Sequence, residues 1–349
     1  MSASMKLQPF RCFAAGVMGL VASCATIPVM GDPAVTVFAQ AETVPVGTTN
    51  EDAADDPAIW RNNADPASSL IVGTDKKGGL YVYNLSGEQL SFMPAAGLNN
   101  VDLVELPDGE VLVAASDRSD LATAHVQLAT LDKSSGKLTP TERIEVGSGE
   151  GYGICMIAVA ADNSITIISA PKNGIIYRTD LALAGEGLAT RTLTTVPSQP
   201  EGCVIDPRTN TLYIGEEMAG IWAIDLDSGD KRLVASVDNA MLVADVEGLA
   251  LAPEGDDAGY LIASSQGDNA YAVYALPEYE PVGRFRIAAG SVGSVEETDG
   301  IELDTRGFGP QFPAGLFVAQ DGINPPRAQN FKLVRWDEII ARLKGSPQN

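Results

Sequence analysis

Six short segments recur along the chain at intervals of 44 to 52 residues, and each begins with a residue whose side chain offers an oxygen or amide ligand to a metal ion. The six residues are Asp56, Asn100, Tyr152, Glu201, Glu247 and Asp299, and Asp245 lies close to the fifth. Carboxylates that share a small volume repel one another unless a cation compensates their charge. Because oxygen ligands without histidine or cysteine suit hard cations, the set predicts a Ca²⁺ site, with Mg²⁺ or Mn²⁺ as alternatives. If the acids are only scattered strand starts and turn residues, no metal site is expected.

A second pattern, an apolar run that ends in small and polar residues, follows each copy of the first. Its copies are LIVGTDK, VLVAASDR, TIISAPK, LYIGEEM, YLIASSQ and LFVAQDG. The first three end in a cation, Lys76, Arg118 or Lys172, whereas the later ones offer acids or neutral groups. In a chain with few basic residues, this asymmetry predicts a site that holds a multiply charged anion against bound metal. The alternative is that these cations are solvated residues at strand ends.

The repeat length predicts the elements that position these residues. Most second copies precede another run of alternating type, with Gly, Asp or Ser turns between, so each repeat contains three or four short strands. Six such repeats predict an all-β, six-bladed β-propeller that forms one domain over residues 25–349. The last repeat lacks a fourth strand, so we expect TVFAQAETV (36–44) to pair there and close the ring. Only WDEIIARLK (336–344) has helical spacing.

Composition excludes several classes of protein. The formal net charge of −23 argues against a nucleic-acid partner, because phosphate binding needs a basic surface. The single histidine, His125, excludes Ser-His-Asp hydrolases and HExxH peptidases. The segment from Cys203 to Arg208 is one residue too short for a cysteine phosphatase loop, and no nucleotide-binding loop is present. A hydrolase with this composition would use carboxylates and metal.

The N-terminus indicates export from the cytoplasm. Residues 1–24 read as a signal peptide, with Lys6 and Arg11 before a short apolar core. Cys24 ends a possible lipobox, so the mature protein is expected to be secreted, periplasmic or a lipid-anchored surface protein, with ordinary cleavage as the alternative. Cys155 and Cys203 remain in the mature chain, where they could pair or be two buried small apolar residues.

At these same residues the sequence resembles the β-propeller phytases, calcium-dependent alkaline enzymes of the 3-phytase type that release phosphate from myo-inositol hexakisphosphate. The resemblance runs through nearly the whole mature chain in the order of the family. The matching stretches are ADDPAIW (54–60), KKGGLYVYNLSGE (76–88), LNNVD (98–102), AASDRS (114–119), Tyr152-Gly153, EGCVIDPRTNTLYIGEE (201–217), DVEGLAL (245–251), GYLIASSQG (259–267), TDGIEL (298–303), GPQFPAGLFVAQDG (309–322) and QNFKLVRW (329–336).

The resemblance implies several calcium ions and two adjacent phosphate subsites. Ligands of the catalytic calcium cluster would be Tyr152, Glu201, Glu217, Asp245 and Glu247. Lys76, Arg118 and Lys172 would bind the phosphate that is cleaved, and Lys77 would serve the neighbouring subsite. Channel or stabilising calcium sites would take Asp56, Asn100, Gln266 and Asp299. The chain departs from the family in the short segment 322–330, which puts one peripheral calcium in doubt, and in Cys155 and Cys203.

The resulting hypothesis is a calcium-dependent phytase that acts as a monomer on phytate. Glu201 and Asp245 would hold the metal ions that carry the attacking water, and Tyr152 would orient that water. No covalent phosphoenzyme is expected, because no activated nucleophile is visible. Two alternatives are a calcium-dependent propeller lactonase or esterase, and a binding propeller on the cell surface without catalytic activity.

Overall fold

The computed structural model describes residues 1, 29–49, 52–159, 163–183 and 187–345. The signal peptide predicted over residues 1–24, with the lipobox at Cys24, lies outside the described residues apart from Met1. Among the described residues, every helix is too short or too polar to span a bilayer.

Six sheets follow one another along the chain, and each corresponds to one sequence repeat. Blade 1 contains β3 (Ala54–Trp60), β4 (Leu70–Asp75), β5 (Gly79–Asn84) and β6 (Gln89–Pro94), with the 3-10 helix η1 (Pro66–Ser68) before β4. Blade 2 contains β7 (Leu98–Glu105), β8 (Val111–Asp117), β9 (Thr123–Leu131) and β10 (Leu138–Ser148). Blade 3 contains β11 (Gly153–Val159), β12 (Ser164–Ala170), β13 (Ile175–Ala182) and β14 (Leu188–Thr195).

The second half of the chain repeats this arrangement. Blade 4 contains β15 (Pro200–Asp206), β16 (Thr211–Glu216), β17 (Gly220–Asp225) and β18 (Lys231–Ser236). Blade 5 contains β19 (Val246–Glu254), β20 (Ala258–Ser265), β21 (Ala270–Leu276) and β22 (Glu280–Ala288), with η2 (Gln266–Asp268) after β20. Blade 6 contains β23 (Ile301–Asp304), β24 (Leu316–Asp321) and β25 (Asn330–Arg335). The predicted six-bladed β-propeller is confirmed, and the predicted helix is α1 (Trp336–Gly345).

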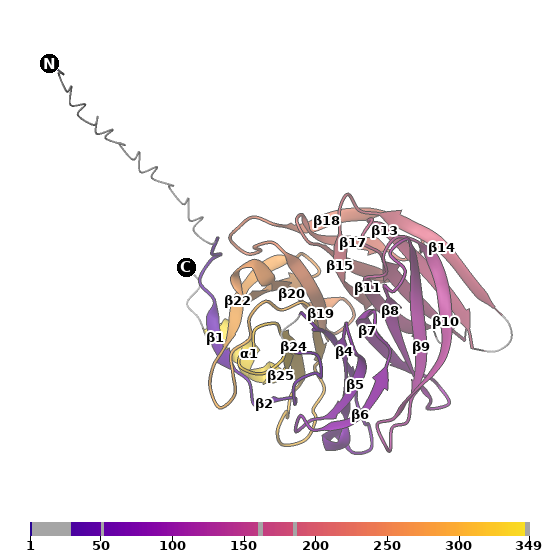
Figure 1. Ribbon diagram of the computed structural model, residues 1–349, viewed down its shortest axis with the longest axis horizontal. Helices are drawn as coiled ribbons and strands as arrows, with labels where there is room; N and C mark the ends of the chain where they lie inside the picture. The colour runs from indigo at the N-terminus through magenta and orange to yellow at the C-terminus, as the bar shows by residue number, and fades with distance from the viewer. Residues whose placement is uncertain (2–28, 50–51, 160–162, 184–186, 346–349) are drawn as a thin grey trace.

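The first strand of each blade lies innermost, and the six inner strands contact one another in a closed ring (Figure 1). Apolar side chains fill the space between neighbouring blades. Val72 of β4 and Val113 of β8 belong to one such cluster, and Phe285 and Phe317 pack with their ring centroids 5.5 Å apart between blades 5 and 6. Their burial holds the ring together and fixes the positions of the inner strands.

The N-terminal segment closes the ring through two strands, where the sequence predicted one. β1 (Val35–Phe38) pairs in parallel with β22 as a fifth strand of blade 5, and β2 (Ala41–Glu42) pairs antiparallel with β25 of blade 6. The prediction was therefore right for blade 6 and wrong for the first half of the segment. A straight strand cannot pair with two sheets, so the chain passes between blades at residues 39–40, beside α1 (Figure 1).

A buried ion cluster fastens β2 to blade 6. The side chain of Lys332 is fully buried, and its ammonium lies 2.9 Å from Glu42 and 2.7 Å from Asp321. It also donates a hydrogen bond to Asn330. Burial by itself would raise the pKa of Glu42, but hydrogen bonds from Lys332 and Arg327 outweigh this effect and lower the pKa from 4.5 to about 2. Glu42 is therefore charged and stabilises the closure at neutral pH.

We expect Glu42→Gln to lower the free energy of unfolding by about 2 kcal/mol at pH 7, because a buried ammonium loses one carboxylate partner. The pKa of Glu42 is lower in the folded state, so its stabilisation is complete above its unfolded pKa and declines as the pH falls toward 2. Denaturant unfolding curves between pH 7 and pH 3 should show a shrinking difference from the native protein. The exposed Glu142→Gln on β10 is the control, and a difference that does not change with pH would contradict this role for Glu42.

Candidate metal and phosphate site

Four inner strands carry a β-bulge where the recurring polar residues lie. The register shifts fall between Ala54 and Pro57, Leu98 and Val101, Pro200 and Cys203, and Val246 and Leu249. A bulge leaves residues without ladder partners and changes the direction of their side chains. Asp55 consequently contacts Lys76 at the mouth of the ring, the end where each second strand finishes, whereas Asp56 lines an interior cavity.

Glycines next to the acids let neighbouring blades approach closely. A Cβ atom on Gly153 would lie 2.1 Å from the carbonyl oxygen of Glu201, and one on Gly202 would lie 2.2 Å from that of Glu247. A Cβ atom on Gly300 would likewise lie too close to the carbonyl oxygen of Asp55, at 2.7 Å. The N–H of Gly300 donates a hydrogen bond to the same oxygen. Because only glycine fits at these positions, the repeated pairs of a polar residue and a glycine, Tyr152-Gly153, Glu201-Gly202 and Asp299-Gly300, let the polar residues of adjacent blades approach one another.

Three carboxylates meet at the mouth, from Glu201, Glu217 and Glu247. One oxygen of each lies within 4.8 Å of the other two, and no other group of three possible ligands from His, Cys, Asp or Glu comes so close among the residues that the structure describes. Glu201 and Glu247 are buried, and Oε2 of Glu247 has no hydrogen-bond partner. An unpartnered buried oxygen beside two further carboxylates is an arrangement that a cation would complete, and an all-oxygen set suits a hard cation.

The pKa values of these groups reflect their burial first and the neighbouring carboxylates second. Burial raises the pKa of Glu201 to about 7. Burial and the neighbouring charge of Glu201 raise the pKa of Glu247 well above its ordinary value. Burial, together with the carboxylates of Glu201 and Glu247, also raises the pKa of the Tyr152 phenol. A divalent cation at this point would favour the charged forms of all these groups.

Lys76 lies among acids on the blade 1 side of the mouth. Its ammonium is 2.9 Å from Asp55, 3.1 Å from Asp299 and 2.8 Å from Asp52. Burial by itself would lower the pKa of Lys76, but these carboxylates, Asp55 first, hold it well above its ordinary value. Gln266 donates a hydrogen bond of 2.6 Å to the second oxygen of Asp299. The cation is thus fixed beside the carboxylates instead of extending into solvent.

Arg118 and Lys172 lie together against the ring of Tyr152. The guanidinium carbon of Arg118 is 5.6 Å from the ring centroid, and Nζ of Lys172 is 4.3 Å from it. Both cations also share Oε1 of Glu150, at 2.5 Å and 3.5 Å. Arg118 donates a further hydrogen bond to Asn99, whose amide donates to Glu201. The basic pair is therefore coupled to the acidic cluster through Tyr152 and Asn99.

Two of the four residues predicted for channel or stabilising calcium sites line a cavity below this mouth, whereas Gln266 and Asp299 lie beside Lys76. Asp56 and Asn100 line an interior cavity of about 180 Å³, together with Asp102 and Glu302. Burial, and then the charge of Asp55, raises the pKa of Asp56 well above its ordinary value. Asn100 also reaches the cluster at the mouth, because its side-chain amide lies 3.1 Å from Oε1 of Glu201.

The last two predicted residues lie at the edge of the site. Asp245 precedes β19, and its charge contributes to raising the pKa of Glu217, although burial is the larger cause. Lys77 is exposed in the turn after β4, next to Lys76. The structure places both beside the groups with which the sequence associated them.

Sequence reasoning missed four residues of the mouth: Asp52, Asp55, Asn99 and Glu150. Asp55 and Asn99 immediately precede the residues that repeat spacing selected, and only the bulges show that they face the mouth. Glu150 lies two residues before Tyr152, so its closeness to a residue of the first recurring pattern could have indicated that it belongs to the mouth. Asp52 belongs to neither recurring pattern.

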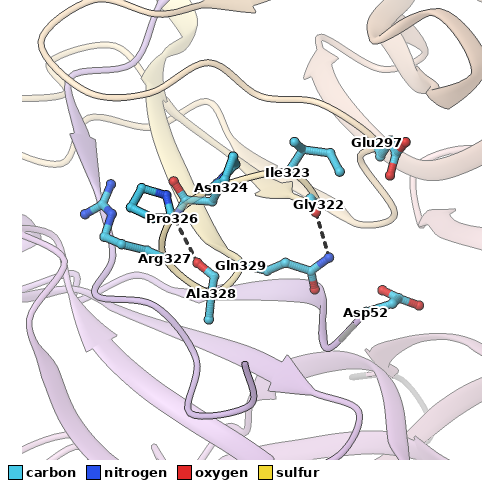
Figure 2. A pocket seen from close by; sticks show the side chains of 10 residues that line it. Asp52, Glu297, Gly322, Ile323, Asn324, Pro326, Arg327, Ala328 and Gln329 are labelled. Atoms are coloured by element: carbon cyan, nitrogen blue, oxygen red, sulfur yellow. Dashed lines mark hydrogen bonds between the residues drawn. The ribbon is translucent and has the colours of Figure 1, made fainter. Parts of the chain in front are cut away.

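An open hollow of about 560 Å³ adjoins the mouth at blade 6 (Figure 2). Asp52, a partner of Lys76, forms one wall, and the segment 322–329 forms another. In that segment Gln329 donates a hydrogen bond to the carbonyl of Gly322 (Figure 2). The hollow extends the accessible surface from the site toward the edge of the propeller.

Taken together, the fold and the mouth define a six-bladed propeller that presents carboxylates suited to a cation beside basic groups suited to an anion. The chain matches the Phytase family over residues 12–348, and it belongs to that family. It is 37% identical over 333 residues to a protein from Bacillus subtilis (strain 168) described as 3-phytase, which covers 89% of this chain and 86% of the relative.

A solved structure shares the fold. Regucalcin from Agrobacterium tumefaciens, described as a calcium-binding protein, aligns with a TM-score of 0.55 and 14% identity. The alignment covers 86% of this chain and 95% of regucalcin.

We expect Glu247→Gln to stabilise the protein when divalent cations are removed by a chelator. The pKa of Glu247 is raised in the folded state, so its destabilising effect begins above its unfolded pKa and grows as the pH rises. The variant should match the native protein near pH 4 and exceed its free energy of unfolding by about 1 kcal/mol or more at pH 8. Thermal unfolding in chelator measures this, and a variant that is less stable at pH 8 would argue against a strained cluster.

Proposed function

We propose that the protein is a calcium-dependent phytase that hydrolyses phosphate monoesters of myo-inositol hexakisphosphate. The observation that carries this proposal is the contact of Lys172 and Arg118 with Tyr152, whose phenol is influenced by the carboxylates of Glu201 and Glu247. Groups that can bind a cation and groups that can bind an anion therefore border the same space. Membership of the Phytase family and the similarity to a 3-phytase support the same substrate class.

Calcium would be held by Glu201, Glu217 and Glu247, with Tyr152 and Asp245 at the edge of the cluster. When bound, calcium supplies positive charge that lowers the pKa of a coordinated water and offsets the charge of phosphate oxygens. Glu201 and Asp245 are our choices for the ligands beside the attacking water, and Tyr152 orients that water. Among the described residues of the mouth, no side chain is paired with a general base that would activate it as a nucleophile, so we expect direct attack by water.

The basic side chains would bind the phosphate that is cleaved. Lys76, Arg118 and Lys172 each pair with carboxylates at the mouth, so phosphate oxygens would replace or share those partners. Lys77, exposed in the adjoining turn, would contact a neighbouring phosphate of the same substrate. These residues neutralise charge that the metal ions leave uncompensated.

Removal of calcium should abolish phosphate release from phytate, and added Ca²⁺ should restore it, because the carboxylate cluster would lose the charge that permits an anion to bind. Phosphate release measured after chelation and after dialysis into Ca²⁺ tests this expectation. A lactone panel assayed in parallel separates the proposal from a propeller lactonase. Full turnover in a thoroughly calcium-stripped sample would refute the proposal.

Lys172→Met should lower kcat/KM for phytate by about 10- to 100-fold, since one charge-assisted hydrogen bond to phosphate is lost. Lys133→Met is the matched control, because Lys133 pairs with Glu105 on the surface, away from the mouth. Steady-state kinetics with saturating calcium measures both variants. Equal activity of Lys172→Met and the control would remove Lys172 from the phosphate site.

A further inference from the structure

Specific contacts tie the inner part of each blade to the next at five of the six junctions. Three are backbone hydrogen bonds, and two are hydrogen bonds from a backbone N–H to an aspartate of the preceding blade. The pairs are Val101 N–H to Asp56, Met156 N–H to Asp102, Val246 N–H to the Glu217 carbonyl, Gly248 N–H to the Asp299 carbonyl, and Gly300 N–H to the Asp55 carbonyl.

The junction of blades 3 and 4 is different. In the described part of the chain, no hydrogen bond joins β11 to β15, and the tie is instead a disulfide between Cys155 and Cys203. Their Cα atoms are 5.4 Å apart, and 48 residues separate them in sequence. Both cysteines line the interior cavity directly below the mouth. The sequence left open whether these two cysteines pair, and the structure contains the disulfide.

This junction carries two groups of the proposed metal site. Tyr152 immediately precedes β11, three residues before Cys155, and Glu201 lies in β15, two residues before Cys203. Glu217 lies on the same blade as Glu201, and Glu247 lies on blade 5, so in the metal-free protein their repulsion acts on Glu201, and the junction with blade 3 must fix its distance from Tyr152. The junction that sets the distance between Tyr152 and Glu201 is therefore the one that is closed covalently.

We propose that the Cys155–Cys203 disulfide is a positioning element that holds Tyr152 and Glu201 at their cation-binding separation and so sets the calcium affinity of the mouth. The inference rests on the calcium dependence in the proposed function. Without the bond, Arg178 would still tie the outer part of blade 3 to the carbonyl of Leu226 in blade 4, but the inner strands would be free to adopt other separations between Tyr152 and Glu201 in the metal-free protein. Calcium would then have to select the competent fraction, and the apparent dissociation constant would rise in inverse proportion to that fraction.

The test compares the calcium affinity of the native protein with that of Cys155→Ala/Cys203→Ala, by competition with a chromophoric calcium chelator. We expect affinity to fall about tenfold, which corresponds to a competent fraction of about one in ten. Phytate hydrolysis should require more calcium for half-maximal activity, while kcat at saturating calcium is retained. Native protein treated with dithiothreitol, which supplies the two electrons and two protons that convert the disulfide to thiols, should behave like the variant.

Val334→Ala on β25 is the control for general loss of stability, because Val334 is buried in the apolar cluster between blades 5 and 6, which contains no residue of blades 3 or 4. It should lower the melting temperature without changing calcium affinity. If the double variant does not fold, the reduced native protein and Cys155→Val/Cys203→Ala provide the comparison. An affinity within twofold of the native value, or free thiols at both positions in the native protein, would overturn the inference alone. A native protein that binds no calcium would overturn the proposed function as well.

Discussion

Repulsion among buried carboxylates is the constraint on which the arrangement of this protein depends. Glu201, Glu217 and Glu247 bring their oxygens within 4.8 Å of one another, although burial makes each charge unfavourable. An open sheet could relieve this repulsion by moving its strands apart. A closed ring resists such movement, because each inner strand is packed on both sides by its neighbours. The energy that keeps the acids together comes from the apolar clusters between the blades, and a cation can then use the resulting site.

The same ring determines how basic groups are used. Lys76 is held by Asp55 and Asp299, whereas Arg118 and Lys172 share Glu150 and the face of Tyr152. These side chains are long and lose much conformational freedom when they are fixed, so their pairing with acids prepares them for an anion. Asn99 links the basic side chains to the carboxylate cluster, because it accepts a hydrogen bond from Arg118 and donates one to Glu201. The mouth is therefore one network in which metal and phosphate ligands depend on each other.

The sequence predicted the number of blades because a propeller blade is a local unit of about 50 residues, and its strands leave a repeated pattern. It also predicted α1, whose apolar spacing is independent of distant contacts. It did not predict that residues 36–44 divide between two blades, since β1 and β2 are selected by free edges far along the chain. The same limit explains why Asp55 and Asn99 were missed: the β-bulges that turn them toward the mouth form only when the second strands of their blades pair.

The amino-acid sequence by itself determined the class of fold, the chemical character of the site and most of the residues that border it. Residue type and spacing are properties of the chain that do not depend on how it folds. Tertiary structure alone decided that Asp56 lines the cavity while Asp55 reaches the mouth, and that Cys155 bonds to Cys203. It also decided that Glu150 is shared by two cations. These facts depend on which side chains from different blades come within a few ångströms, and closure of the ring sets those distances.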